Sequence, residues 1–232
     1  SNSFTGLGAG TYQVSVRDAA NTTCVKDLDA SAGTTLTQPT LLTNTNALSN
    51  YNGVNISCNG GSNGTITATP AGGTSPYTYQ WYTGSGTTSA ISGQTANLIS
   101  GLTAGTYTVK VIDGNGCITT TTSTLTQPSI GLIATITSTT DVSCNGLSDG
   151  STGVNAIFGT APYTYAWTGP GTFTATTATI SNLAASTTPY SVTVTDVNGC
   201  TATTSATVVQ PAALTITNSN VQVLCYGNAN GS

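Results

Sequence analysis

Charged side chains are scarce in this sequence, and two residue types are missing entirely. Only 4% of its 232 residues are charged, and it contains no histidine and no glutamate. Average soluble domains carry about 25% charged residues. The three basic residues are too few to neutralise a nucleic-acid backbone or an anionic membrane surface. General acid–base catalysis is also poorly supplied without His and Glu. We therefore expect no enzyme, no nucleic-acid partner and no cofactor.

Methionine and long apolar runs are missing as well. Because there is no Met, we expect the chain to be a piece of a longer protein. No segment approaches the ~18 consecutive apolar residues that span a bilayer, so we expect no direct membrane insertion. Hydrophobic residues nevertheless make up 37% of the chain, which is enough for a core. Polarity comes from Thr, Ser and Asn, and Thr favours β-strands.

Several short motifs recur in the same order, which indicates internal repeats. A Gln-Pro pair closes each unit, at Pro39, Pro128 and Pro211. Three other motifs recur between these closing pairs: 58–60 (CNG) as 144–146, 76–81 (PYTYQW) as 162–167 (PYTYAW), and 115–117 (NGC) as 198–200. The predicted domains are the C-terminal part of a repeat at 1–39, complete repeats at 40–128 and 129–211, and an N-terminal fragment of the next repeat at 212–232.

Within a unit the apolar residues alternate with polar ones. Tyr77, Tyr79 and Trp81 show this period of two, and Gly, Pro and Asn clusters bound such runs, which is typical of half-buried antiparallel strands. No segment has a helical period. The predicted fold is all-β, with tandem Ig-like (PKD-like) antiparallel β-sandwich repeats in a head-to-tail rod.

Two aromatic positions favour the Ig-like sandwich over other β folds. The Trp residues lie on the third predicted strand, where Ig-type cores bury one, and residues 102–107 have the pattern of a tyrosine corner. We therefore expect four aromatic residues in the cores: Trp81, Trp167, Tyr107 and Tyr190.

The combination of motifs resembles a known family. The series Cys-Asn-Gly, Pro-Tyr-x-Tyr-x-Trp, Ala-Gly-Thr-Tyr-x-Val, Asp-x-Asn-Gly-Cys and Gln-Pro resembles the SprB-type repeat of gliding-motility adhesins in Bacteroidetes, over essentially the whole chain. The chain departs from the pattern at 185–190 and 19–24, which are predicted loops. The resemblance implies a very long extracellular cell-surface protein, exported by the type IX pathway and attached to the outer membrane.

The acidic residues suggest turns before they suggest a metal site. Asp18, Asp113 and Asp196 occupy one repeat position, just before an expected turn, where Asp typically accepts hydrogen bonds from its own backbone. Calcium is the alternative, but one carboxylate per loop is a weak ligand set, so we expect no metal. The weak calcium candidates are Asp113, Asn115, Asn145 and Asp149.

Two aromatic residues raise sugar binding as an alternative to the more common role of scattered surface or loop-anchoring aromatics. Tyr82 and Phe173 lie off the main alternation and are candidates to stack on pyranose rings. The position of Tyr82 holds Thr168 in the next repeat, which disfavours sugar binding through this strand.

The cysteines predict disulfides in an oxidising compartment. No CxxC motif and no His are present, so zinc is not expected. One Cys lies before the second strand of each repeat, and one lies just after the turn between the sixth and seventh strands. The six positions are Cys24, Cys58, Cys117, Cys144, Cys200 and Cys225.

Two pairings remain open. Bridges within repeats would join Cys58 to Cys117 and Cys144 to Cys200. In an Ig-like sandwich, however, these positions lie at opposite poles, ~20 Å apart, whereas a disulfide needs Cα atoms within about 7 Å. We favour a bridge between repeats, Cys58 to Cys200. The other four cysteines would then bond to neighbouring repeats: Cys24 and Cys117 to repeats before residue 1, and Cys144 and Cys225 to repeats after residue 232.

Together these features predict a structural or adhesive segment of a long cell-surface filament, with neighbouring repeats as partners and an unknown surface or glycan ligand. The alternative is a carbohydrate-binding module array, or a passive spacer, of a secreted polysaccharide-degrading enzyme.

Overall fold

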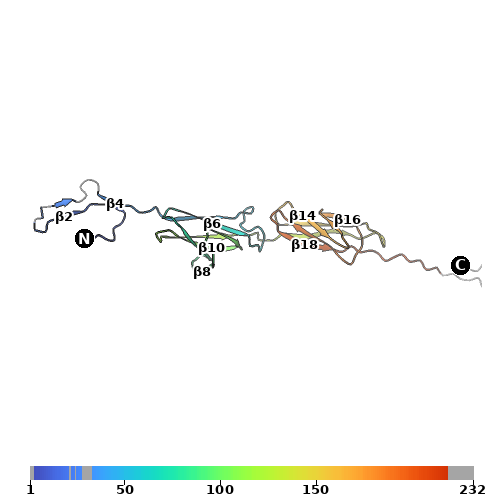
Figure 1. Cartoon of the computed structure of the whole chain (residues 1–232). Helices are drawn as coiled ribbons and strands as arrows, with labels where there is room; N and C mark the ends of the chain where they lie inside the picture. Colours follow the sequence, from blue (N-terminus) through green and yellow to red (C-terminus); the bar gives the residue numbers. More distant parts are fainter. Residues whose placement is uncertain (1–2, 21, 24, 28–32, 219–232) are drawn as a thin grey trace, which may run out of the picture. The chain divides into compact units, whose positions relative to one another are not determined.

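The computed structural model describes residues 3–20, 22–23, 25–27 and 33–218, in which every regular element is a β-strand (Figure 1). The chain divides into two compact units. The first unit comprises Ser1–Leu48 and Thr65–Leu125, and the second comprises Ser49–Gly64 and Thr126–Ser232. The predicted repeat boundaries remain a prediction. Among the described residues, no helix is long and apolar enough to cross a membrane.

The first 39 residues contribute two short ladders to the first unit. β1 (Gly10–Tyr12) pairs with β4 (Thr34–Leu36), and β2 (Ser15–Arg17) pairs with β3 (Val25–Asp27). Both pairs are antiparallel. This segment therefore has strands of its own.

The remainder of the first unit forms two antiparallel sheets with a defined strand order. The three-stranded sheet has the order β5-β6-β9, and the four-stranded sheet has the order β11-β10-β7-β8. The strands are β5 (Thr43–Leu48), β6 (Gly64–Ala71), β7 (Thr78–Thr83), β8 (Ser89–Ala90), β9 (Leu98–Leu102), β10 (Gly105–Ile112) and β11 (Ile118–Leu125).

The second unit repeats this order. Its sheets are β12-β13-β16 and β15-β14-β17-β18. The strands are β12 (Ile133–Thr140), β13 (Gly150–Ile157), β14 (Thr164–Thr168), β15 (Thr174–Ala175), β16 (Thr179–Leu183), β17 (Tyr190–Thr195) and β18 (Thr201–Ala206). When the strands of each sandwich are lettered A, B, C, C′, E, F and G in chain order, one sheet has the order A-B-E and the other has the order C′-C-F-G. This is an Ig-like arrangement. The predicted all-β, Ig-like fold is confirmed.

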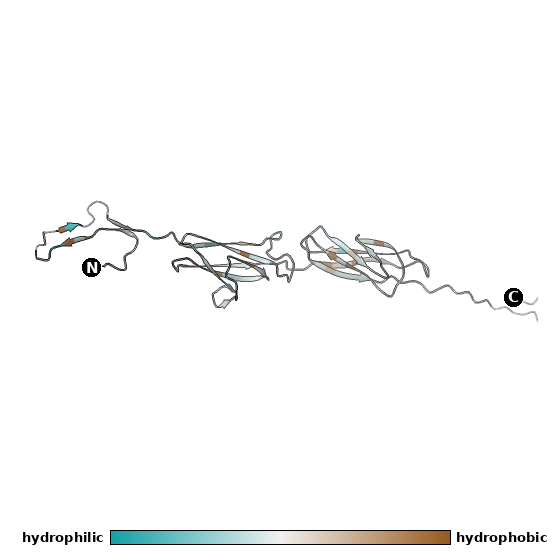
Figure 2. Cartoon of the chain, viewed as in Figure 1, coloured by the Kyte–Doolittle hydropathy of each residue, from teal (hydrophilic) through white to brown (hydrophobic). Residues whose placement is uncertain are grey.

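A tryptophan is buried in each sandwich. Trp81 on β7 is 0% exposed and Trp167 on β14 is 1% exposed. Their indole N–H groups donate to the carbonyls of Ala96 (2.8 Å) and Thr177 (2.9 Å). A buried indole needs such an acceptor, so both rings lie in the core without an unpaired donor. In Figure 2 most of the ribbon is pale or teal, and the brown, apolar residues lie mainly along the strands.

A tyrosine leads into the sixth strand of each sandwich. The hydroxyl of Tyr107 donates to the carbonyl of Thr103 (3.1 Å), and that of Tyr190 donates to the carbonyl of Ala184 (3.0 Å). This backbone contact a few residues upstream defines a tyrosine corner. Tyr190 forms its corner although the Ala-Gly-Thr turn is altered in this repeat.

Neutral polar side chains connect the two sheets of the first unit at one edge. Asn44 and Asn46 on β5 donate to the hydroxyls of Thr121 (3.0 Å) and Ser123 (2.9 Å) on β11. Such contacts cover strand edges that would otherwise be open to other chains. The sheet edge is thus protected without charged residues.

Candidate functional site at the Cys58 loop

The loop 49–64 belongs to the second unit and begins with a tight hairpin. Tyr51 and Val54 pair across Asn52 and Gly53, whose φ angles are +54° and +96°. Positive φ at both central residues is the requirement of a type I′ turn, which Asn-Gly meets best. This sequence therefore places Tyr51 and Val54 side by side at the start of the loop.

A hydrogen-bonded clasp joins the Cys-Asn-Gly motif to the Gln-Pro motif. The Asn59 side chain donates to the carbonyl of Pro128 (2.8 Å), and the Gly60 N–H donates to the side-chain oxygen of Gln127 (2.9 Å). These groups are nearly 70 residues apart in the sequence. The two motifs are therefore the two sides of one contact.

Further hydrogen bonds, which join residues 55 and 56 to Thr126, add to this clasp. The amides of Asn55 and Ile56 both donate to the carbonyl of Thr126, each at 2.9 Å. In return, the Thr126 N–H donates to the side-chain oxygen of Asn55 (2.9 Å). The segment before Cys58 and the segment before Pro128 are thus fixed to one another in register.

The same clasp occurs a second time, one repeat later. Asn145 donates to the carbonyl of Pro211 (3.1 Å), and the Gly146 N–H donates to the side-chain oxygen of Gln210 (2.9 Å). Both Cys-Asn-Gly motifs therefore have the same local structure.

The turn that carries Cys200 is organised by one buried carboxylate. One oxygen of Asp196 accepts the N–H groups of Asn198 (2.9 Å) and Cys200 (2.8 Å), and the other accepts the N–H of Thr160 (2.9 Å). The Asn198 side chain also donates to the Thr160 hydroxyl (3.0 Å). Asp196 thus ties the β17–β18 turn to the β13–β14 loop, and we call these two loops the socket.

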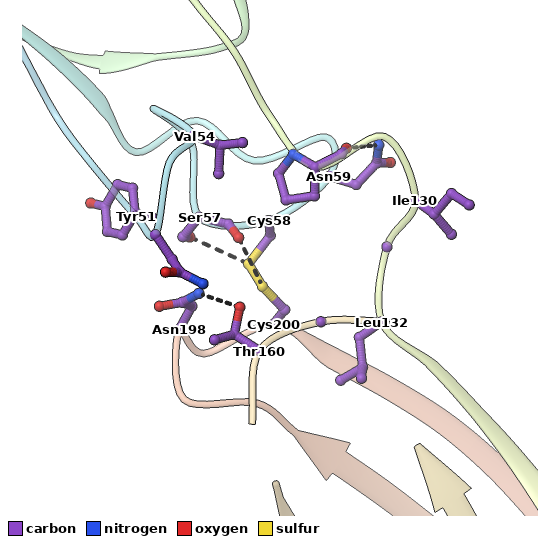
Figure 3. A pocket seen from close by; sticks show the side chains of 14 residues that line it. Tyr51, Val54, Ser57, Cys58, Asn59, Ile130, Leu132, Thr160, Asn198 and Cys200 are labelled. Carbon is purple, nitrogen blue, oxygen red and sulfur yellow. Dashed lines mark hydrogen bonds between the residues drawn. A yellow bond between two sulfur atoms is a disulfide. The ribbon is translucent and has the colours of Figure 1, made fainter. Parts of the chain in front are cut away.

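The loop 49–64 and the socket are joined by a disulfide. Cys58 and Cys200 are bonded, with their Cα atoms 5.6 Å apart (Figure 3). This is the pairing between predicted repeats, not the one within them. Cys117 and Cys144 are exposed free thiols. Cys24 and Cys225 lie outside the described residues.

A small hollow lies beside the disulfide. It is about 200 Å³ in volume, and Figure 3 shows Tyr51, Val54, Leu132 and Asn198 around it. Its lining residues carry no charge. Pockets for drug-sized ligands usually measure about 300–1,000 Å³. The hollow is better explained as a space left between the Cys58 loop, the linker 128–132 and the socket than as a small-molecule site.

The first unit contains the same socket framework around Asp113. Its carboxylate accepts the N–H groups of Thr74 (2.9 Å), Asn115 (3.0 Å) and Cys117 (2.8 Å). Burial alone would raise the pKa of Asp113, but the N–H donors of Thr74, Cys117 and Asn115 outweigh it and lower the pKa. Asp113 is therefore held as a carboxylate.

The weak calcium candidates have other partners. Both oxygens of Asp113 are directed at N–H donors, so a cation would have to displace those donors. Asp149 accepts the hydroxyl (2.6 Å) and the N–H (3.0 Å) of Ser143, and these bonds lower its pKa, the hydroxyl first. Asn145 belongs to the clasp. In the described part of the chain, no three His, Cys, Asp or Glu side chains form a metal cluster.

The two aromatic residues considered for sugar binding do not form exposed platforms. Tyr82 is 9% exposed. Phe173 packs edge-on against Tyr190, with ring centroids 5.1 Å apart. Tyr82 is buried together with its neighbour Trp81, although successive strand residues point to opposite faces, so period two alone does not give its exposure.

Sequence reasoning did not identify the clasp. It treated Cys-Asn-Gly and Gln-Pro as separate markers of the repeat. The available signal was that both pairs recur together, with a side-chain amide in each. Nothing in one sequence assigns donors and acceptors across such a separation.

Comparison with family models identifies the repeated segment. Residues 50–86 and 136–172 each match the SprB repeat. The resemblance inferred from the motifs is thus confirmed at two places. Each SprB match contains one Cys-Asn-Gly loop and one Trp-bearing strand, and together they cover about a third of the chain.

Two solved structures are distantly similar. The three N-terminal domains of the Highly Immunogenic Outer Capsid protein (Hoc) of bacteriophage RB49 share 19% identity at a TM-score of 0.45, over 73% of this chain and 58% of that one. The four N-terminal Ig domains of Dscam1 isoform 1.9 share 16% identity at a TM-score of 0.26, over 65% and 42%. The chain spans less than two thirds of either. No curated protein matches it.

Proposed function

We propose that this chain is a load-bearing structural and adhesive segment of a long cell-surface filament, without catalytic activity. The observation that carries the proposal is the disulfide between Cys58 and Cys200, which are 142 residues apart in sequence. The two SprB repeat matches support a repetitive surface protein.

The disulfide changes the path that a pulling force takes. When the chain is pulled from its ends, tension reaches Cys58, crosses the sulfur–sulfur bond and leaves from Cys200. All strands from β6 to β17 lie between these residues. They are therefore excluded from the load, and only strands outside the bridge, such as β5 and β18, can be peeled away.

The clasp adds a non-covalent restraint at the same place. Its hydrogen bonds hold the linker before residue 129 against the loop that carries Cys58. Each such bond contributes about 1 kcal/mol net, so the clasp alone is weaker than a covalent bridge. We propose that the clasp limits bending where one repeat joins the next and that the disulfide limits extension.

Single-molecule force spectroscopy on the full chain tests this role. Between residues 58 and 200 the chain can extend by roughly 500 Å at full stretch. We expect this length to be missing from the unfolding traces of the oxidised chain and to appear after reduction. Equal contour lengths before and after reduction would contradict the load-bearing role.

The setting of the filament belongs to the same proposal. We propose an extracellular, outer-membrane-attached protein that is exported by the type IX pathway and acts in gliding or attachment. The SprB repeat matches and the disulfide support this setting. Labelling of intact cells with an antibody against the 232-residue chain tests it. Labelling that requires permeabilised cells would argue against surface display.

A further inference from the structure

The first unit contains a socket whose counterpart in the second unit is filled. Around Asp113, the Gly73, Thr74 and Asn115 positions repeat the framework of Gly159, Thr160 and Asn198. The Asn115 side chain donates to the Thr74 hydroxyl at 3.0 Å, the distance found in the filled socket.

Cys117 has the same position in this framework as Cys200. Its N–H donates to Asp113 at 2.8 Å and its carbonyl accepts the Asp113 N–H at 3.0 Å. The corresponding distances from Cys200 to Asp196 are 2.8 Å and 3.0 Å. The thiol of Cys117 is nonetheless exposed and unbonded.

Apolar residues surround this free thiol. Leu41 is 84% exposed and Ile118 is 56% exposed, and both line a hollow with Gly73, Asp113 and Cys117. In the second unit, the corresponding residues Gly131 and Leu132 line a hollow together with Cys58 and Asn59, so the Cys58 loop lies over this surface. An exposed apolar patch of this kind is typical of an interaction site.

The second unit contains the complementary element. Cys144 is exposed and unbonded, in the same clasped loop that presents Cys58 in the filled junction. Asn145 and Gly146 hold this loop on the segment 210–211. Asp149 closes it on Ser143, as Asn63 closes the Cys58 loop on Ser57, whose N–H lies 3.1 Å from the Asn63 oxygen.

We infer that Cys117 and Cys144 are the two unfilled halves of the junction formed by Cys58 and Cys200. The Cys117 socket binds the clasped Cys-Asn-Gly loop of a preceding repeat of the same kind. The Cys144 loop docks into the Asp-x-Asn-Gly-Cys socket of a following repeat. Each docking ends in a disulfide: two thiols lose two protons and two electrons to a thiol–disulfide oxidant of the oxidising compartment, such as oxidised glutathione.

A covalent consequence follows from the spacing. Cys144 lies between Cys58 and Cys200 in the sequence, so successive bridges would overlap. Every peptide bond of the repeated region would then be spanned by at least one disulfide. A single backbone cut would leave the filament covalently continuous. This inference stands on the socket geometry and does not depend on where the chain is displayed.

A duplicated chain tests the docking directly. A leading copy, residues 1–211, is followed by a trailing copy, residues 40–232. The Cys144 loop of the leading copy then lies a single repeat before the Cys117 socket of the trailing copy. Cys117→Ser in the leading copy and Cys144→Ser in the trailing copy leave only that pair. Cys24→Ser and Cys225→Ser, each present once, remove competing thiols.

After oxidation with glutathione, cleavage before Asp should yield peptide 141–148 of the leading copy linked to peptide 113–140 of the trailing copy. Iodoacetamide labelling of both thiols should fall at least tenfold. The Cys58–Cys200 bridge in each copy reports that the repeats are folded. With those bridges intact, the inference is overturned if Cys144 and Cys117 stay reactive, or if 141–148 links to another cysteine peptide.

Discussion

At the residue scale, single carboxylates set the shape of the socket loops. Asp113 and Asp196 each satisfy three backbone N–H donors from two loops. Buried N–H groups that lose an acceptor are costly, which accounts for an Asp at these two positions in a chain that has so few charges.

The socket carboxylate should make the first unit sensitive to acid. Because the pKa of Asp113 is lowered on folding, its stabilisation is complete above the unfolded pKa and is lost as the pH falls through the folded pKa. In Asp113→Asn, the side-chain NH₂ group would replace one of the two accepting oxygens, so that it would face a backbone N–H donor without forming a hydrogen bond. We expect it to lower the urea midpoint at pH 7 and to reduce the difference between pH 7 and pH 3.

Asp149→Asn is the matched control. Asn63 performs the same loop closure in the other repeat, so an amide at 149 should be tolerated at pH 7. The pH-dependent part of stability from Asp149, whose pKa is also lowered, should vanish. An equally large loss at pH 7 from both variants would contradict this account of the socket.

The tyrosine corner gives a second prediction at this scale. Tyr190→Phe removes the hydrogen bond to the Ala184 carbonyl but keeps the ring against Phe173. We expect a loss of about 1 kcal/mol in the free energy of unfolding, since a buried hydrogen bond contributes about that much. Urea unfolding of a Trp81→Phe background, in which Trp167 is the remaining tryptophan, measures it by fluorescence. No change would show that the corner is not a stabilising contact.

At the scale of elements, the Cys-Asn-Gly loop is held by its linker before any disulfide is made. In both copies of the motif the same two donors meet Gln-Pro. Because the Cys144 loop has this structure with a free thiol, the clasp does not require the bridge. The clasp therefore holds the Cys144 loop in place before its thiol forms a disulfide.

Removing the clasp acceptor should loosen one loop only. Gln127→Ala leaves the Gly60 N–H without its acceptor, and the loss of a bond of about 1 kcal/mol corresponds to roughly fivefold faster amide exchange. Hydrogen exchange followed by NMR at Gly60 measures this.

Gln210→Ala is the matched variant for that experiment. It should speed exchange at Gly146 and leave Gly60 unchanged. Faster exchange at both glycines in either variant would show that the loops depend on general stability and not on their own clasps.

Much of the element structure could be predicted from the sequence. Alternating Tyr77, Tyr79 and Trp81 predict a strand because side-chain direction has a period of two. The exposure of Tyr82 could not be predicted in this way, because tertiary packing covers this residue and a local sequence pattern does not contain tertiary packing. The clasp could not be predicted for the same reason, since its hydrogen-bonding partners are nearly 70 residues apart in the sequence.

At the scale of the whole chain, the disulfide is the feature that connects motif to function. The sequence favoured Cys58 with Cys200 through topology alone, because Ig-like strands keep the two loop sets of a sandwich apart. The hydrogen-bonded socket that receives Cys58 could not be predicted in this way, since it depends on two loops that are distant in the sequence meeting in space.

Non-reducing peptide mapping of the oxidised chain tests the central claim most directly. Trypsin cannot decide, because Cys117 and Cys200 both follow Lys110 and share one peptide. Cleavage before Asp separates them, into 113–140 and 196–232, and leaves Cys58 in 29–112. A Cys200→Ser variant distinguishes Cys200 from Cys225. The account predicts that 29–112 is linked to 196–232 and that this link disappears in the variant. A link between 29–112 and 113–140 would contradict it.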